Sequence, residues 1–344
     1  MAIIDKPSDF FNTKLWTGTG NAQTISGVGF QPDLSWSKGR NYDYAHQLID
    51  SVRGITKQLN SNDDQPEGTN ANGITAFNSD GFVIGTQPEM SSNGKTFASW
   101  NWKAGTSFTN DASSTGIGTI DSTGSASDTS GFSIVSYTGT GSAGTIKHGL
   151  STAPDLFIIK RRDSANDWRV GSSALTNFVK HVNLNTTAAE SDLAAAFNST
   201  GPTTSVFSVG TSVSTNASSG TYIAYCFASI NSYSKFSSYI GNGNADGTFV
   251  YLGFKPAFVM IKSSSNSGQA WVMQDNKRDG FNYNNHRLFA NSSATEESTV
   301  RMDLLSNGFK CRDNDGNGNG FTYIFMAFAE NPFVASNFNP ATAR

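Results

Sequence analysis

Cysteine is nearly absent from the 344-residue sequence, which contains only Cys226 and Cys311. Two cysteines build no disulfide framework, so the composition gives no support for secretion through an oxidising compartment. The first residues also lack the charged start and the apolar stretch of a signal peptide. We therefore expect the protein to be made in a reducing cytoplasm.

Charged residues are scarce as well. They make up 15% of the chain, the net charge is −3, and the strongest basic block is only Lys160-Arg161-Arg162. Binding to nucleic acid needs a clustered cationic face, so we expect no nucleic-acid partner. No apolar run approaches the roughly 20 residues that a bilayer-spanning helix requires, so we expect no membrane insertion.

A helix-favouring pattern of Ala, Glu, Lys and Leu is also missing, and what replaces it is typical of β-structure. The chain contains 34 glycines and 25 phenylalanines, together with many Ser, Thr and Asn residues. Such a composition suits short antiparallel strands joined by turns. Large flat side chains fill the space between two sheets efficiently. The composition therefore predicts an all-β protein.

An internal repeat is the strongest feature of the sequence. Four landmarks recur three times in the same order: a Gly-x-Gly turn, a Pro followed by an apolar strand that ends in Lys, a Phe after a polar turn, and an aromatic strand. The spacing between successive landmarks agrees to within three residues in all copies. The Gly-x-Gly turn begins at Gly18, Gly139 and Gly241, and the Pro is Pro32, Pro154 and Pro256. The Phe is Phe82, Phe207 and Phe309, and the aromatic strand begins at Phe97, Tyr222 and Tyr323.

These landmarks divide the chain into three units, at residues 1–105, 131–230 and 231–344. Residues 106–130 are rich in Ser, Thr, Gly and Asp and predict a flexible linker. The join between the second and third units is short, which predicts tight coupling of these two. Each unit has several short strands separated by turn residues. The fold prediction is therefore three tandem β-sandwich or jelly-roll-like repeats of about 100 residues.

We predict no catalytic residue and no cofactor. No two of the four histidines have the spacing of metal ligands, and no Gly-x-Ser-x-Gly motif is present. The acidic pairs Asp63-Asp64 and Glu296-Glu297 lie in polar loops, where neighbouring side chains point to opposite faces. They do not predict the two carboxylates that flank a glycosidase cleft. A polysaccharide-acting enzyme is the least favoured function.

One segment resembles part of a calcium-binding loop. Asp313, Asp315 and Asn317 supply oxygen atoms at alternate positions, and Gly318 occupies the sixth position. The twelfth position, where such loops carry Glu, is Ile324. The segment also coincides with hairpin turns in the other two units. A turn is therefore favoured over a weak divalent-cation site, which stays open as the alternative.

Aromatic residues outside the repeat strands are the candidates for recognition. Trp168 and Trp271 follow the landmark Lys of their units at matched positions, and the first unit carries Tyr42 and Tyr44 in this stretch. We expect these four residues on an exposed recognition or subunit-contact surface. The landmark lysines should lie along a sheet edge with their charge in water; they are Lys38, Lys160 and Lys262. The tryptophans of the repeat strands are assigned to the core; they are Trp36, Trp100 and Trp102.

Several motifs also resemble one protein family. They are residues 29–33, 51–54, 78–82, 100–105, 222–228, 254–258, 328–333 and the closing Thr342-Ala343-Arg344. This ordered set resembles a domain of unknown function that recurs in predicted virion proteins of marine tailed bacteriophages. The resemblance spans nearly the whole chain and implies a structural protein of the virion surface, made in the host cytoplasm. It implies no activity and no catalytic residues.

Two placements in the particle stay open. Repeated β-units with aromatic and Asn/Ser/Gly-rich loops favour a tail-fibre, tail-appendage or receptor-binding component that contacts a host surface glycan or protein. The lack of a helical stalk or collagen-like run favours a capsid decoration protein as the alternative. Other virion proteins are the expected partners. A homo-oligomer is expected because virion proteins are symmetric as a rule, and a trimer is plausible, although three units in one chain could replace three subunits.

Overall fold

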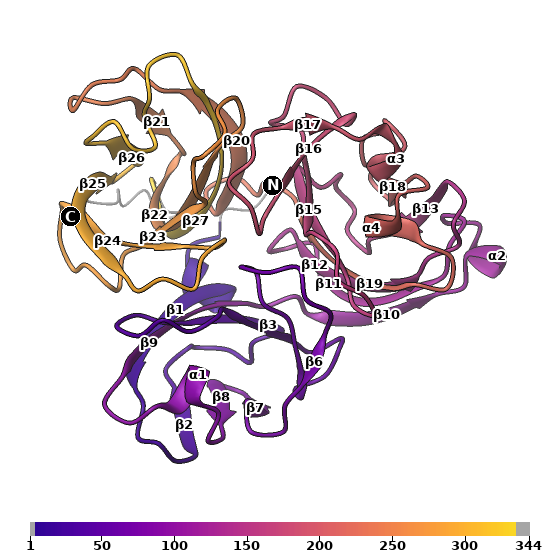
Figure 1. Cartoon of the computed structure of the whole chain (residues 1–344), viewed down its shortest axis with the longest axis horizontal. Helices are drawn as coiled ribbons and strands as arrows, with labels where there is room; N and C mark the ends of the chain where they lie inside the picture. Colours follow the sequence, from indigo (N-terminus) through magenta and orange to yellow (C-terminus); the bar gives the residue numbers. More distant parts are fainter. Residues whose placement is uncertain (1–3, 335–344) are drawn as a thin grey trace.

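A computed structural model describes residues 4–334 of the chain. These residues form mainly antiparallel sheets, in three units arranged around a common centre (Figure 1). Unit 1 extends to strand β9, unit 2 runs from β10 to β19, and unit 3 runs from β20 to β27. The prediction of an all-β fold with three tandem sandwich-like repeats is confirmed. The closing motif at 342–344 lies outside the described residues.

Each unit contains a main sheet of four strands in the same order. In unit 1 the order is β1 (Phe11–Thr17), β9 (Thr96–Trp102), β3 (Leu34–Gly39) and β4 (Gln47–Asp50). In unit 2 it is β12 (Phe132–Thr138), β19 (Thr221–Phe227), β14 (Leu156–Arg161) and β15 (Arg169–Ser172). In unit 3 it is β20 (Ser234–Ile240), β27 (Thr322–Pro332), β22 (Phe254–Ser263) and β23 (Val272–Asp275). The aromatic landmark strand and the Pro-led strand are thus the two central strands of every main sheet.

A second sheet completes each sandwich. In unit 1 it consists of β2 (Gln23–Ser26), β8 (Gly81–Ile84) and β7 (Ile74–Asn78), and in unit 2 of β13 (Gly144–Lys147) and β18 (Val206–Val209). In unit 3 it consists of β21 (Phe249–Tyr251), β26 (Gly308–Cys311) and β25 (Glu297–Leu305). Strand β24 (Asn284–Phe289) joins the two sheets of unit 3 into one eight-stranded sheet that nearly closes into a barrel.

Short elements fill the connections. Two-residue strands pair as β5 (Lys57–Gln58) with β6 (Gly68–Thr69), while β16 (Lys180–Asn183) and β17 (Ser191–Asp192) extend the main sheet of unit 2. The helical elements among the described residues are single turns: η1 (Pro7–Asp9), α1 (Pro88–Ser91), α2 (Ala112–Thr115), α3 (Ala194–Phe197) and α4 (Val213–Asn216). No helix among the described residues is long and apolar enough to cross a membrane.

The predicted flexible linker at 106–130 is wrong. This segment forms β10 (Thr106–Asn110), α2 (Ala112–Thr115) and β11 (Ser122–Ser127), and both strands pair into the main sheet of unit 2 beside β12. Ser and Thr suit the solvated face of an edge strand as well as they suit a linker. Phe108 supplies an apolar contact, because its ring lies against the backbone of Gly124 on the neighbouring strand. Unit 1 is therefore joined to unit 2 without a spacer.

The first Gly of each Gly-x-Gly turn permits a close approach between two backbone segments. In all three units, a Cβ atom at this position would lie 2.3 Å from a carbonyl oxygen of the loop before the aromatic strand. Real Cβ atoms do not approach oxygen this closely, so only glycine fits. The three glycine and carbonyl pairs are Gly18 with Ser92, Gly139 with Ala217, and Gly241 with Gly318.

Four hydrophobic clusters of the described residues hold the three units together. Three of them fill the interiors of the three sandwiches. The fourth lies between the units, where the outward faces of the three main sheets meet, and it contains buried residues from all three. Aromatic rings dominate its centre, and they include Phe11, Trp102, Phe132, Phe227, Phe258 and Phe328. Separating any unit would expose this shared core to water, at a large cost in free energy.

Candidate functional site

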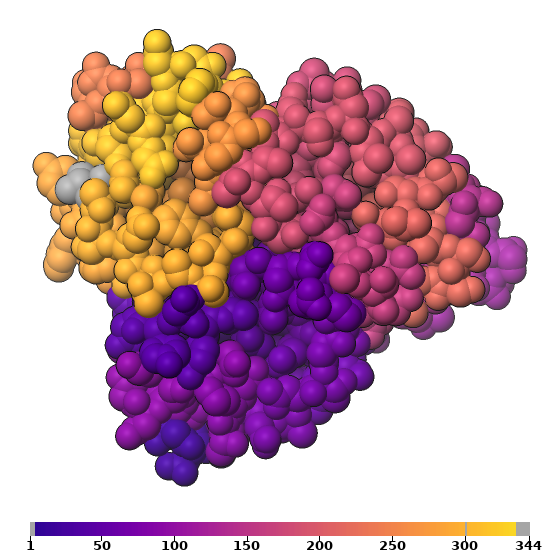
Figure 2. All heavy atoms as spheres, in the orientation of Figure 1, coloured from indigo at the N-terminus to yellow at the C-terminus, as the bar shows by residue number. Residues whose placement is uncertain are grey.

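The three units contact one another in a closed head-to-tail ring. Unit 1 contacts unit 2, unit 2 contacts unit 3, and unit 3 returns to unit 1, so all pairs lie side by side (Figures 1 and 2). A backbone hydrogen bond from a glutamate N–H marks the same place in each contact: Glu67 to the Arg162 carbonyl at 2.8 Å, Glu190 to Ser264 at 2.7 Å, and Glu296 to Arg40 at 2.7 Å.

Trp168 and Trp271 lie inside the ring contacts, so the prediction that they are exposed is wrong. Their exposed fractions are 0% and 1%. The Nε1 atom of Trp168 donates to the Asn60 carbonyl of unit 1 at 2.9 Å. Trp271 donates in the same way to the Asn183 carbonyl of unit 2 at 2.8 Å. Both rings join neighbouring units of one chain, which explains why the repeat carries them at matched positions.

The first unit uses His46 at this position rather than Tyr42 or Tyr44. The Nδ1 atom of His46 accepts a hydrogen bond from Trp36, and its Nε2 atom lies 2.9 Å from the Phe289 carbonyl of unit 3. Burial lowers the pKa of His46 to about 3, so the imidazole is neutral and its Nε2–H donates. The sequence spacing could have identified His46, because His46 and Trp168 each follow the landmark Lys of their unit by eight positions.

Tyr42 and Tyr44 are the two predicted recognition residues that the structure brings together at the surface. Their ring centroids are 4.4 Å apart, and the Nζ atom of Lys95 lies 4.7 Å from the centre of the Tyr42 ring. Tyr42 is 41% exposed, whereas Tyr44 is half-buried with its hydroxyl 3.0 Å from Ser92. This pair is a small feature beside the ring contacts.

The landmark lysines are buried, which corrects the expectation that their charge lies in water. Lys160 donates to the carbonyls of Asp64 in unit 1 and Asn166 in unit 2, at 2.9 and 2.7 Å. Lys262 donates to Thr187 in unit 2 at 3.1 Å. Burial lowers the pKa of Lys38, Lys160 and Lys262 to about 8 in each case. An ammonium group with backbone carbonyls in reach can be buried at a strand end, a possibility that the sequence alone did not indicate.

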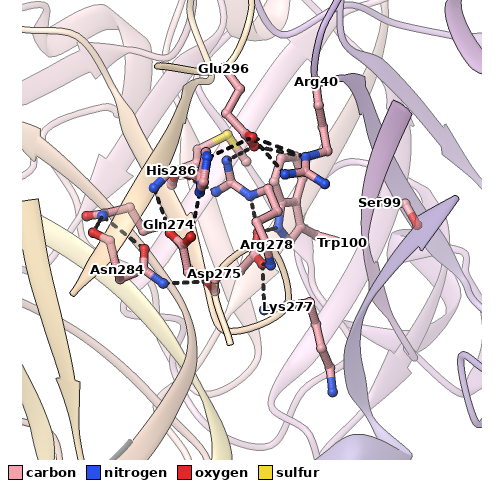
Figure 3. A network of polar contacts seen from close by, with 12 residues as sticks. Arg40, Ser99, Trp100, Gln274, Asp275, Lys277, Arg278, Asn284, His286 and Glu296 are labelled. Atoms are coloured by element: carbon pink, nitrogen blue, oxygen red, sulfur yellow. Dashed lines mark hydrogen bonds and ion pairs between the residues drawn. The ribbon is translucent and has the colours of Figure 1, made fainter. Parts of the chain in front are cut away.

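The contact from unit 3 to unit 1 contains a network of buried charges (Figure 3). Arg278 bonds to Asp275 at 2.6 Å and to Glu296 at 3.0 Å, and Arg40 of unit 1 reaches the same glutamate at 2.8 Å. Trp100 of unit 1 donates its indole N–H to Asp275 at 3.0 Å. Burial alone would raise the pKa of Asp275, but the adjacent Arg278 holds it below its usual value.

The contact from unit 1 to unit 2 repeats this network residue by residue. Arg53 bonds to Asp50 at 2.5 Å and to Glu67 at 3.2 Å, and Arg162 of unit 2 reaches Glu67 at 2.9 Å. The Tyr225 hydroxyl of unit 2 donates to Asp50 at 2.7 Å. Tyr225 and Trp100 occupy the same register on the aromatic strands, since each is the direct partner of the third residue of its Pro-led strand.

The contact from unit 2 to unit 3 lacks the whole network. Ser172 and Leu175 stand where the other units have Asp and Arg, and Met326 stands at the register of Tyr225. Ser264 replaces the arginine that would reach Glu190, and Glu190 instead accepts a hydrogen bond of 2.6 Å from Thr176 of its own unit. At this register of the aromatic strands, a polar donor thus occurs only in the two contacts where a buried carboxylate accepts from it.

Two of the three weak cation candidates, Asp313 and Asp315, converge on the guanidinium of Arg301, and the Asp315 carboxylate lies 3.7 Å from its Nη1 atom. Arg301 pairs with Asp313, and Arg287 pairs with Asp315. The Asn317 side chain bonds to the Gly-x-Gly loop instead, donating to Asn242 at 2.8 Å and accepting from its backbone N–H at 3.1 Å. Between residues 4 and 334, no group of three or more His, Cys, Asp or Glu side chains has a metal-binding arrangement. The turn interpretation of this segment fits the geometry.

Most of the buried charged and polar side chains described above therefore lie at contacts between units. Buried charges and ring N–H groups hold one unit to the next, and so do Lys160 and Lys262. Lys38 instead donates to the Gly39 and Tyr42 carbonyls of its own unit. Sequence reasoning missed Asp50, Arg53, Asp275 and Arg278, although the spacing Asp-x-x-Arg recurs at the end of the fourth main-sheet strand in units 1 and 3. The arrangement can fix the position of three sandwiches in one rigid body.

The three units together match a single family model. No curated protein matches the chain. A family model described as a domain of unknown function (DUF7483) matches residues 6–332, which spans all three units and their contacts. The chain belongs to this family, the domain of unknown function DUF7483.

Proposed function

We propose that the chain is a non-enzymatic structural protein on the surface of a tailed-phage virion, and that it serves as a tail appendage or receptor-binding component. The observation that carries the proposal is the ring itself. Its buried charges and ring donors are engaged in joining the units, as Trp100 and Asp275 illustrate. A rigid body of three sandwiches offers loops at its periphery for contact with other molecules.

The resemblance of the sequence motifs to virion proteins supports the particle setting. The shared aromatic core supports a structural role, because a unit cannot separate from the others without exposing it to water. Host-surface glycan or protein contact would use the exposed loops, and the Tyr42 and Tyr44 pair is one such place. Other virion proteins are the partners that hold the chain on the particle.

A capsid decoration protein is the second candidate, and one observation favours it. The described residues fold into one closed ring of units, with no elongated stem between them (Figure 1). A compact body of this kind suits attachment to a shell by one of its faces. A tail fibre is more often extended, but an appendage tip can be compact.

The number of copies per particle separates the two placements. Quantified protein bands from purified virions, with the major capsid protein as the internal standard, give this number. A few to a few tens of copies would support the appendage, and hundreds of copies would support decoration of the capsid. Absence of the protein from purified particles would overturn both.

Assays on cell-envelope polysaccharide test the non-enzymatic part of the proposal. Release of reducing sugar by the purified chain, abolished by changing a single carboxylate, would overturn it. The variants Asp43→Asn and Glu190→Gln are suitable, because Asp43 is exposed and the Glu190 carboxylate accepts a hydrogen bond within its own unit.

A further inference from the structure

Exposed apolar side chains concentrate on unit 3. Within residues 4–334, eight large hydrophobic residues are exposed, and six of them belong to this unit. Scattered single apolar residues on a surface are ordinary, but a local concentration indicates an interaction site. The six residues are Ile240, Phe249, Tyr251, Phe281, Tyr283 and Val334.

Strand β21 carries the centre of this concentration. Phe249 and Tyr251 are 45% and 54% exposed, whereas Val250 between them is buried in the sandwich. Their direct neighbours on β26 are Lys310 and Gly308. The side chains of Phe249 and Tyr251 therefore lie on the outward face of the second sheet, away from the centre of the three-unit ring.

A second pair of exposed aromatic residues lies at the other side of this sheet. Phe281 is 80% exposed and Tyr283 is 55% exposed. Asn282 between them bonds through its side chain to both the N–H and the carbonyl of Leu304, at 2.9 and 3.0 Å. The pair is thus fixed beside β25, two strands from β21. We call the outward surface formed by β21, β26, β25 and residues 281–283 the unit 3 face.

The fold does not require aromatic residues at these positions of β21. The equivalent residues can be read from the register, because Val250, Ile25 and Ile146 each pair with the landmark Phe of their unit. Units 1 and 2 therefore supply two natural controls for the positions of Phe249 and Tyr251. The equivalents are Thr24 and Ser26 in unit 1, and Thr145 and Lys147 in unit 2.

The edge of β21 is already tied to β20, so the face rather than the edge is available. Lys235 donates to the Tyr251 carbonyl at 2.8 Å, and Thr248 donates to the Ile240 carbonyl at 2.9 Å. The first contact occupies a backbone acceptor of β21 that an added strand would use, and the second ties the residue before β21 to β20. A partner must therefore contact side chains.

Charges of both signs lie beside the two aromatic rings. Lys310 pairs with Asp246 at 2.5 Å, and Arg312 pairs with Asp303. Lys235 adds a third cation, with its Nζ atom 5.7 Å from the centre of the Tyr251 ring. A surface that presents both signs is complementary to its own copy when a two-fold axis relates the two.

We propose that the unit 3 face binds the unit 3 face of a second copy of the chain. The aromatic rings of β21 form the apolar centre of this isologous contact, and the mixed charges form its rim. Four exposed rings present an apolar area on the order of a few hundred Å², less than the ~800 Å² per partner of a stable standard interface. The dimer is therefore weak and forms in the micromolar range. This inference concerns the purified chain and does not depend on the virion role.

Sedimentation equilibrium of the purified full chain tests the proposal, at concentrations from about 1 to 200 μM, where a micromolar dimer dissociates. The wild-type chain is expected to show a monomer–dimer equilibrium. The double variant Phe249→Thr/Tyr251→Ser, which carries the residues of unit 1, is expected to raise the Kd of the dimer at least tenfold. Val213→Thr removes an exposed apolar side chain from unit 2, and it should leave the Kd unchanged.

A monomer throughout this concentration range would overturn the proposal. So would a dimer or higher oligomer whose Kd is the same in the double variant, because another surface would then form the contact. Far-ultraviolet circular dichroism and the urea midpoint of each variant verify folding. The substituted residues already occupy these positions in a sister unit, so loss of fold is not expected.

Discussion

The indole N–H of Trp100 in unit 1 donates a hydrogen bond of 3.0 Å to Asp275 of unit 3, across 175 positions of sequence. This bond closes the ring, because units 3 and 1 are not adjacent in the chain. Asp275 also accepts from Arg278, and both side chains are fully buried. The Asp275 carboxylate thus serves one donor from each of the two units that this contact joins.

Removing that carboxylate should be strongly destabilising. Asp275→Ala leaves the Arg278 guanidinium buried with one partner fewer and the Trp100 N–H without an acceptor. Breaking a buried pair in this way costs about 3–5 kcal/mol. Urea unfolding followed by tryptophan fluorescence measures the loss. Asp246→Asn is the control, because its carboxylate is 78% exposed and a surface pair contributes about 0–1 kcal/mol. Equal losses in the two variants would contradict the assignment.

The three contacts should also obey a pairing rule. Ser172→Asp alone places a carboxylate at the contact between units 2 and 3 without an arginine or a ring donor. We expect it to destabilise the protein by several kcal/mol. Adding Leu175→Arg and Met326→Tyr rebuilds the pattern of the contact between units 1 and 2, and should recover most of the loss. Free energies from urea unfolding of the single, double and triple variants measure the coupling. Purely additive effects would show that the correlated residues do not act together.

The number of units and their landmarks could be predicted because local geometry demands them. A Gly-x-Gly turn and a Pro at a strand start satisfy constraints within one unit, so they repeat wherever the unit repeats. The central core was harder to foresee, since it depends on which faces of the main sheets meet. In unit 2, Leu156-Phe157-Ile158-Ile159 shows no alternation, which is typical of a strand buried on both faces.

In unit 1, the sequence of the corresponding strand does not show that it is buried on both faces. Its Pro-led strand alternates apolar Leu34 and Trp36 with Ser35 and Ser37, which indicates a strand with one solvated face. The structure buries all four residues, because the serines line the interior of the sandwich where unit 2 has Phe157 and Ile159. The ring partners could not be predicted for a different reason. A tryptophan that donates to a backbone carbonyl of another unit requires no particular side chain there, so the sequence does not identify its partner.

The buried lysines predict a dependence of stability on pH. Burial lowers the pKa of Lys160 to about 8, below the value near 10.4 expected in the unfolded chain. Between these pH values the unfolded state binds more protons than the folded state, so the free energy of unfolding gains a positive slope with pH. The advantage of the wild type over Lys160→Met should therefore grow from pH 8 to about pH 10.5. Urea midpoints of both proteins measure this difference, in which the ionisation of tyrosines largely cancels. A constant difference across this window would refute the prediction.

Two buried thiols can report whether the ring unfolds as one body. Cys226 lies in the sandwich core of unit 2 and Cys311 in that of unit 3, and burial raises the pKa of each thiol to about 12. Neither should react with iodoacetamide in the native protein at pH 8, because the thiolate is the reactive form. Since the units share the central core, both thiols should become reactive over the same range of urea concentration. Brief labelling at each urea concentration, followed by peptide mass spectrometry, measures the two residues separately. Labelling of Cys226 at clearly lower urea than Cys311 would show that the contact between units 2 and 3, which lacks the charge network, opens before the sandwiches unfold.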